Sequence, residues 1–288
     1  MFTFLLFTLL LIAIPSAYVS ANEADSIAVE QLLRQGIKEK NDANLMLFYG
    51  LKLRDIPYVA QTLEVNKQEE LVVNLRELDC TTLVENVVAL TLTTKQGSTR
   101  FADFKQNLTR IRYSNGVLNG YASRNHYFSQ WIDSNERLGI VKEVTGKAKT
   151  TPPYFPFVEP QVLKCTYMSA HPELYPMLKN DSQAQQQIAK AEAAINGRTV
   201  RYIPRRLLNR SRKELADVLD GDILAIVTKK QGLDTSHIGI ASWGRDGKLH
   251  LLNASQIHKK VLLEPMTLYD YMKQHPSQLG VRVIRVNS

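Results

Sequence analysis

Cys80, His237 and Asn253 have the residue types and chain order that amide hydrolysis by a thiol requires. In that chemistry a thiolate attacks the amide carbon, and a histidine takes a proton and later returns it. A third polar residue holds the imidazole in the correct tautomer. Taken alone, Cys80 is equally well explained as a small buried residue at a helix start. The elements that carry the three residues must therefore be considered.

Cys80 is predicted to lie at the start of a helix, where Asp79 is a good N-cap and residues 82–85 also fit a capping box. In either frame, the unpaired backbone N–H groups and the positive end of the helix dipole favour an anion there. We therefore expect a lowered pKa for the Cys80 thiol. The apolar residues that follow repeat at the spacing of a buried helix face: Leu83, Val84, Val87, Val88 and Leu90.

His237 is the best placed of the six histidines, because it follows a polar loop and opens a predicted strand. Gly239 leaves space for a close neighbour. Pairing residues 238–242 with 249–253 around a turn at 244–248 brings Asn253 beside His237, where its amide can orient the ring. His250 points to the opposite face of the sheet. Singly, His237 also fits a core histidine, and Asn253 a residue at a strand end.

The wider pattern predicts helices first and a small antiparallel sheet afterwards, which is an α+β arrangement. We expect one domain over residues 22–288, with a helical part at about 25–135, an irregular middle at about 136–198 and a β-rich part at about 199–288. Helices are expected at 28–35, 45–53, 100–111, 128–135 and 183–195, and a proline-rich loop at 150–160. Strands are expected at 200–203, 223–228, 237–243, 249–253, 260–263 and 281–286.

The first 21 residues are predicted to be a signal peptide, because a nearly unbroken apolar run precedes the small-x-small sequence at 19–21. The run is too short for a comfortable membrane span. No Lys or Arg precedes it, so an uncleaved N-terminal anchor is the alternative. We expect an exported protein, periplasmic or secreted, with no membrane span after cleavage.

The chain carries a net charge of +8, which suits an anionic cell-wall polymer, an anionic lipid or no partner at all. Its Lys and Arg residues are scattered without an aromatic-interleaved stripe, which argues against nucleic acid. Two cysteines in an exported chain of this size exclude a disulfide scaffold. A single bridge between Cys80 and Cys165 remains open and would compete with the nucleophile.

Four segments, in this order, resemble the NlpC-type papain-like cell-wall hydrolases: residues 79–82, 221–223, 236–240 and 252–255. Residues 124–128 and 221–228 further resemble one branch, the exported N-acetylmuramoyl-L-alanine amidase-like proteins. The resemblance extends from about residue 30 to residue 285. It implies a papain-like fold in which N-terminal helices carry the cysteine and a C-terminal antiparallel sheet or half-barrel carries the histidine.

By this resemblance Cys80 is the nucleophile, His237 the general base and then acid, and Asn253 the residue that orients the imidazole. The bond cleaved joins the lactyl group of muramic acid to L-alanine of a peptidoglycan or muropeptide stem. No cofactor or metal is implied. One departure stands out, because this branch is expected to have a histidine where the chain has Asn253.

Four residues near the two motifs are predicted to contact the substrate, namely Asp79, Arg124, His126 and Tyr127. Arg124 would bind a stem carboxylate, and an aromatic ring would cover the sugar face. Packing and capping at a helix start explain the residues of the 124–127 stretch equally well.

Three other functions compete with the amidase. A γ-D-glutamyl endopeptidase would use the same chemistry inside the stem peptide. A non-catalytic wall-binding relative is favoured by the departure at Asn253. A zinc amidase would need metal ligands at short spacing, and the sequence has no His-Glu-x-x-His or Cys-x-x-Cys pattern.

Overall fold

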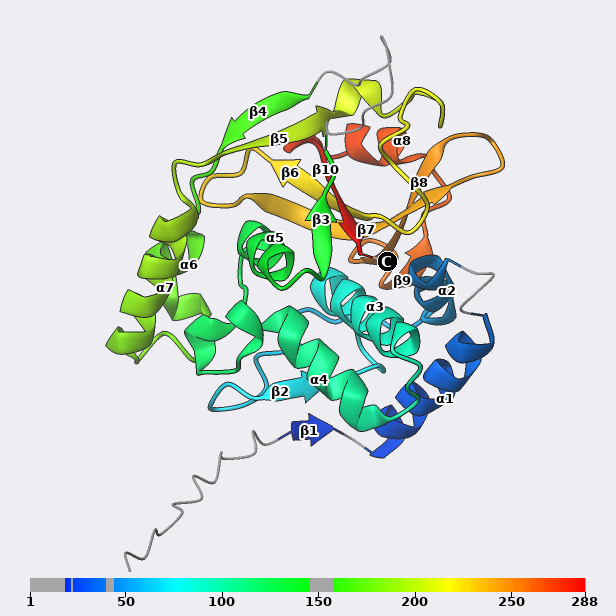
Figure 1. Cartoon of the computed structure of the whole chain (residues 1–288). Helices are drawn as coiled ribbons and strands as arrows, with labels where there is room; N and C mark the ends of the chain where they lie inside the picture. Colours follow the sequence, from blue (N-terminus) through cyan, green and yellow to red (C-terminus); the bar gives the residue numbers. More distant parts are fainter. Residues whose placement is uncertain (1–18, 22, 40–43, 146–157, 288) are drawn as a thin grey trace, which may run out of the picture.

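The computed structural model describes residues 19–21, 23–39, 44–145 and 158–287, and these form an α+β structure (Figure 1). Residues 1–18 of the predicted signal peptide lie outside the described residues, as do residues 150–157 of the predicted proline-rich loop. Residues 19–21 form β1 (Val19–Ala21), which pairs in parallel with β2 (Leu71–Val73). This short pair was not predicted.

An antiparallel sheet of eight strands lies at the centre, in the order β4-β5-β10-β6-β7-β8-β9, and β3 also pairs with β10 (Figure 1). It is larger than the sheet expected from the sequence, because β3 and β4 come from the middle of the chain. The strands are β3 (Val141–Glu143), β4 (Glu159–Val162), β5 (Thr199–Pro204), β6 (Ile223–Thr228), β7 (Thr235–Trp243), β8 (Leu249–Ser255), β9 (Lys260–Leu263) and β10 (Gln278–Val286).

The predicted helices are confirmed with small shifts at their ends, except that the helix predicted at 28–35 extends over residues 23–39. The α-helices are α1 (Glu23–Glu39), α2 (Leu45–Lys52), α3 (Cys80–Lys95), α4 (Phe101–Arg112), α5 (Phe128–Arg137), α6 (Tyr167–Ala170), α7 (Ser182–Ile195) and α8 (Leu268–Lys273). Short 3-10 turns occur at η1 (Ser114–Gly116), η2 (Tyr121–Ser123), η3 (Pro172–Leu174) and η4 (Arg205–Leu207).

The central strands are buried on both faces, which is why β6 reads as a continuous apolar run rather than an alternating one. Ile223 and Ala225 face a core built mainly from α1 to α5. Leu224 and Ile226 face a second core that includes α8 and the segment after β5. Helix α3 is buried along most of its length in the first core, so its first residue is held firmly against the sheet.

The described part of the middle section, residues 136–145 and 158–198, is not irregular, and for these residues the prediction is wrong. Besides the predicted helix at 183–195, it contains β3, β4 and α6, and it builds a third apolar core with the segment around η2. Leu163, Cys165 and Met168 are buried there against Ile188 of α7. Strand β4 and helix α6 were missed because each spans only four residues, too few to show a period.

Candidate active site

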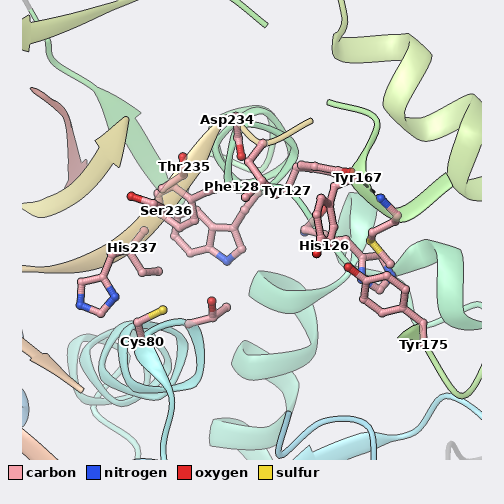
Figure 2. Close-up of a pocket in the computed structure, with 16 residues that line it drawn as sticks. Cys80, His126, Tyr127, Phe128, Tyr167, Tyr175, Asp234, Thr235, Ser236 and His237 are labelled. Carbon is pink, nitrogen blue, oxygen red and sulfur yellow. Dashed lines mark hydrogen bonds between the residues drawn. The ribbon is translucent and has the colours of Figure 1, made fainter. Parts of the chain in front are cut away.

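A cavity of about 220 Å³ lies where the start of α3 meets the start of β7, with the 125–131 segment and α6 forming its other walls (Figure 2). The predicted residues Cys80 and His237 both line it, and so do His126 and Tyr127. Aromatic rings form much of the opposite wall. The structure therefore brings together a thiol and an imidazole that are 157 positions apart in the chain (237 minus 80).

Cys80 is the first residue of α3, and Asp79 is the N-cap as predicted. A carboxylate oxygen of Asp79 accepts a hydrogen bond from the backbone N–H of Thr82 at 2.8 Å. The hydroxyl of Thr82 in turn accepts one from the backbone N–H of Asp79 at 2.9 Å. The capping box is therefore formed by Asp79 and Thr82, and the alternative box over residues 82–85 is not the one used.

The pKa of the Cys80 thiol is raised to about 12, first by burial and second by the negative charge of Asp79. Hydrogen bonds from the backbone of Ile238 and from Thr81 lower it, but they do not outweigh burial. The prediction of a lowered pKa is wrong, chiefly because burial disfavours the thiolate and secondly because the Asp79 carboxylate lies at the positive end of the helix dipole. Cys80 and Cys165 are both free thiols, so the disulfide considered from the sequence is not formed.

His237 and Asn253 are in contact, as the hairpin prediction required. The register of β7 and β8 pairs Ile240 with Leu252, and extending it by one pair places Asn253 opposite Gly239. His237 and Asn253 are then diagonal neighbours on one face. Nε2 of His237 lies 2.9 Å from the amide oxygen of Asn253. A Cβ on Gly239 would lie 2.8 Å from the backbone oxygen of Leu252, so only glycine fits.

The Asn253 contact fixes how the imidazole can act. Because Asn253 presents a carbonyl oxygen, Nε2 of His237 carries the proton and Nδ1 is the basic nitrogen. Figure 2 shows the other ring nitrogen on the side that faces the Cys80 sulfur. Burial lowers the pKa of His237 below its ordinary value, against the raising effects of the Asn253 hydrogen bond and the Glu264 charge. The site therefore pairs a neutral thiol with a neutral imidazole.

Glu264 is a polar neighbour of this site that sequence reasoning missed. It follows β9 directly, it is buried, and its Oε1 accepts a hydrogen bond from the Asn253 amide nitrogen at 3.0 Å. In the sequence, Glu264 is a single acidic residue between a short apolar strand and a proline, a pattern that is typical of a surface turn. Only the pairing of β8 with β9 shows that Glu264 lies behind Asn253.

Asp234 fixes the loop that leads into β7. It lines the cavity, is buried, and accepts a hydrogen bond from the backbone N–H of Ser129 at 2.6 Å. This contact ties the first turn of α5 to the residues just before His237. It was also missed from the sequence, because nothing in the polar loop distinguishes this carboxylate from its neighbours.

Arg124 is buried and already paired. Its guanidinium lies 2.5 Å from Glu64 and 3.4 Å from Glu69, and it stacks over the ring of Tyr121. Two carboxylates of the protein thus neutralise the cation that was predicted to bind a stem carboxylate. Arg124, Asp79 and His126 line a second hollow that adjoins the cavity. The predicted substrate contact of Arg124 stays a prediction.

His126 and Tyr127 also make internal hydrogen bonds. Nε2 of His126 donates to the backbone oxygen of Tyr121 at 2.9 Å, and burial lowers the pKa of His126 to about 3, so the ring stays neutral. The hydroxyl of Tyr127 donates to Glu192 at 2.6 Å and accepts from the backbone N–H of Met168 at 3.1 Å. Both rings line the cavity, and their predicted substrate contacts remain untested.

Two further properties belong to the described residues only. In that part of the chain, no three His, Cys, Asp or Glu side chains lie close enough to hold a metal ion. None of its helices is both long and apolar enough to cross a membrane.

Comparison with known proteins places the chain in a family. The model of the AmiA-like family, described as N-acetylmuramoyl-L-alanine amidase-like, matches residues 49–281. No curated protein matches the chain.

Among solved structures, an N-acetylmuramoyl-L-alanine amidase from Bacteroides uniformis is 39% identical, with a TM-score of 0.77 over 88% of this chain and 100% of its own. A Bacteroides fragilis protein, provisionally described as a xylanase, is 42% identical, with a TM-score of 0.75 over 83% of this chain and 100% of its own. The Legionella pneumophila protein LPG0564 shares the fold at 21% identity, with a TM-score of 0.65 over 91% of this chain and 97% of its own. With most of its length matched by the family model, the chain belongs to the AmiA-like family of N-acetylmuramoyl-L-alanine amidase-like proteins.

Proposed function

We propose that the protein is a cysteine-dependent amidase that hydrolyses the bond between the lactyl group of muramic acid and L-alanine of a peptidoglycan stem. Family membership and the named Bacteroides uniformis amidase support the substrate class. One observation carries the chemistry. It is the hydrogen bond between Asn253 and His237, because His237 lines the cavity together with the Cys80 thiol.

The first half of the reaction starts from the neutral pair. As the Cys80 sulfur attacks the amide carbon, its proton passes to Nδ1 of His237, and the carbonyl π electrons move onto oxygen. The cap uses the N–H groups of Thr82 and Leu83. We assign the N–H of Cys80 as a donor to the resulting oxyanion. The imidazolium that forms keeps its hydrogen bond to Asn253.

The second half returns the proton. His237 protonates the amide nitrogen, the carbon–nitrogen bond breaks, and the free amino group of L-alanine leaves while a thioester remains on Cys80. His237 then takes a proton from water as the water oxygen attacks the thioester. Breakdown of that second tetrahedral intermediate releases the lactyl carboxylic acid, which then ionises in solution, and the sulfur recovers its proton from the His237 imidazolium.

Asn253 fits this mechanism although a histidine was expected at its position. An amide oxygen accepts from Nε2 of His237 in one tautomer and adds no charge to a buried site. We propose the papain-like, NlpC-type arrangement on this basis, with the nucleophile from a helix start and the base from the sheet. Asparagine in place of the expected histidine then changes the group that orients the imidazole, but the orienting role is kept.

The alternative peptidase uses the same residues, so only the products distinguish the two. Purified protein should be incubated with defined muropeptides and the products identified by mass spectrometry. The amidase releases the whole stem peptide with L-alanine at its amino terminus. Cleavage between D-glutamate and the third residue would instead establish the γ-D-glutamyl endopeptidase. The absence of any cleavage by a folded protein would favour the non-catalytic wall-binding relative.

The description of the Bacteroides fragilis relative suggests a glycosidase as another function. The residues that line the cavity give this function little support. Glycoside hydrolysis usually needs two carboxyl groups on either side of the bond. Among the described residues that line the cavity, Asp234 is the single carboxylate, and the backbone N–H of Ser129 donates to it.

The cellular location follows from the substrate. Peptidoglycan lies outside the cytoplasmic membrane, and residues 1–21 have the pattern of an export signal. We propose that the protein is exported to the periplasm or secreted. Detection of the mature chain beginning near Asn22, by amino-terminal sequencing of exported protein, would test this.

A further inference from the structure

We propose that Glu264 is a positioning residue for His237 and that it acts through the amide of Asn253. The proposal rests on the proposed function, in which Nδ1 of His237 takes the thiol proton. Glu264 touches neither the sulfur nor the cavity. Its effect would be to select one of two orientations of the Asn253 amide and so one tautomer of the imidazole.

The contacts of Glu264 make it a fixed acceptor. Its side chain is 1% exposed, and its backbone N–H donates to the oxygen of Leu251 at 2.9 Å, which anchors it to the edge of β8. Oε1 accepts from the Asn253 amide nitrogen at 3.0 Å. The other oxygen lies 3.3 Å from Nε2 of His258, a half-exposed ring at the turn between β8 and β9.

The orientation of the Asn253 amide follows from these contacts. A carboxylate only accepts hydrogen bonds, so the amide must turn its nitrogen to Glu264 and its oxygen to His237. In the opposite orientation, the amide oxygen of Asn253 would face the carboxylate oxygen of Glu264. The amide N–H of Asn253 would then face Nε2 of His237. That arrangement favours the tautomer with the proton on Nδ1, which leaves no basic nitrogen facing Cys80.

Glu264 also has an electrostatic effect at the site. Its negative charge raises the pKa of His237, which burial lowers overall. The other charges that act on His237 are Asp79 at the start of α3, which raises its pKa, and His275 beyond α8, which lowers it. Tyr271 of α8 packs near the ring and also experiences the Glu264 charge.

A double-mutant cycle tests the route through Asn253. Glu264→Ala should lower kcat about tenfold to a hundredfold with KM nearly unchanged, because the amide loses its partner. In an Asn253→Ala background the same substitution should have almost no further effect on kcat. Equal losses in both backgrounds would overturn the proposal. Glu159→Gln, at an exposed ion pair with Arg206, is the control and should leave kcat unchanged.

A second measurement does not depend on turnover. Nitrogen-15 NMR of the imidazole should show His237 protonated on Nε2 in the wild type and a mixture of tautomers in Glu264→Ala. Glu264→Gln keeps an acceptor oxygen but removes the negative charge. This variant replaces Glu264→Ala in the test if the alanine variant does not fold. It should retain the Nε2 tautomer and move the acid limb of kcat/KM to lower pH. An unchanged tautomer in Glu264→Ala would overturn the proposal even if the amidase activity stands, and a changed one would support it even if no amidase activity is found.

Discussion

Two regions beside the same cavity contain similar residue types but differ in whether the polar atoms of these residues are hydrogen-bonded within the protein. Around β7, Nε2 of His237 is held by Asn253, and the other ring nitrogen lies on the side that faces the Cys80 sulfur (Figure 2). Around the 124–127 segment, Arg124 is held by two carboxylates and Tyr127 by Glu192. Chemistry needs a group whose reactive atom is not already committed to the protein. By that criterion we expect the first region to carry the reaction and the second to act mainly as a scaffold.

The two regions also differ in how charge is handled. The β7 region has a neutral thiol and a neutral imidazole at its centre, because burial raises one pKa and lowers the other. The 124–127 region buries full charges and stabilises them with ion pairs. Removal of a residue should therefore affect the rate in the first region and stability in the second.

The largest effect is expected for His237→Gln. The variant lacks the base that takes the thiol proton, so kcat should fall by about 10³-fold, within the usual range for a general base. The free energy of unfolding should change little, because the ring is not part of an apolar core. Steady-state kinetics and urea unfolding measure the two quantities. If His237→Gln unfolds easily but turns over substrate normally while folded, His237 contributes to stability and not to the reaction.

Arg124→Met should show the opposite pattern. Removing the guanidinium leaves Glu64 and Glu69 buried without their cation, which should cost about 3–5 kcal/mol of unfolding free energy. The rate per folded molecule should change only slightly. Arg206→Met, at an exposed pair with Glu159, is the matched control and should cost less than about 1 kcal/mol. A loss of rate in folded Arg124→Met would show that Arg124 contacts the substrate.

The raised thiol pKa predicts slow alkylation of Cys80 at neutral pH. The thiolate is the reactive form, and a pKa of about 12 leaves little of it at pH 7, so the iodoacetamide rate should keep rising above pH 9. A Cys165→Ala variant isolates the signal. Turnover should fall only as pH drops through the pKa of His237, below 6.5, where the imidazole becomes protonated. Alkylation that saturates below pH 7 would indicate a thiolate–imidazolium pair instead.

The smallest effect is expected for His250→Gln. His250 lies on β8 but points away from Asn253, toward Asp246 and the backbone oxygen of Glu264. Its replacement should change kcat by no more than about twofold, as at sites outside special features. A loss as large as that of His237→Gln would place His250 in the reaction.

The sequence predicted much of the framework because its signals are local. The Asp79 cap, the helix that follows and the β7–β8 hairpin all show in residues close together in the chain. Glu264 and Asp234 were missed because their partners come from other elements. The direction of the Cys80 pKa shift was predicted wrongly. The position of Cys80 at a helix start can be predicted from the sequence, but its burial, which raises the pKa, depends on how the whole chain packs.

The most direct test of the central claim is to trap the acyl-enzyme. Wild-type protein turning over a muropeptide should be quenched in acid, and its intact mass and peptide map measured. The proposed cysteine nucleophile predicts an added muramyl-lactyl group in thioester linkage on Cys80, with neither adduct nor turnover in Cys80→Ala. Full muropeptide cleavage by Cys80→Ala would contradict it.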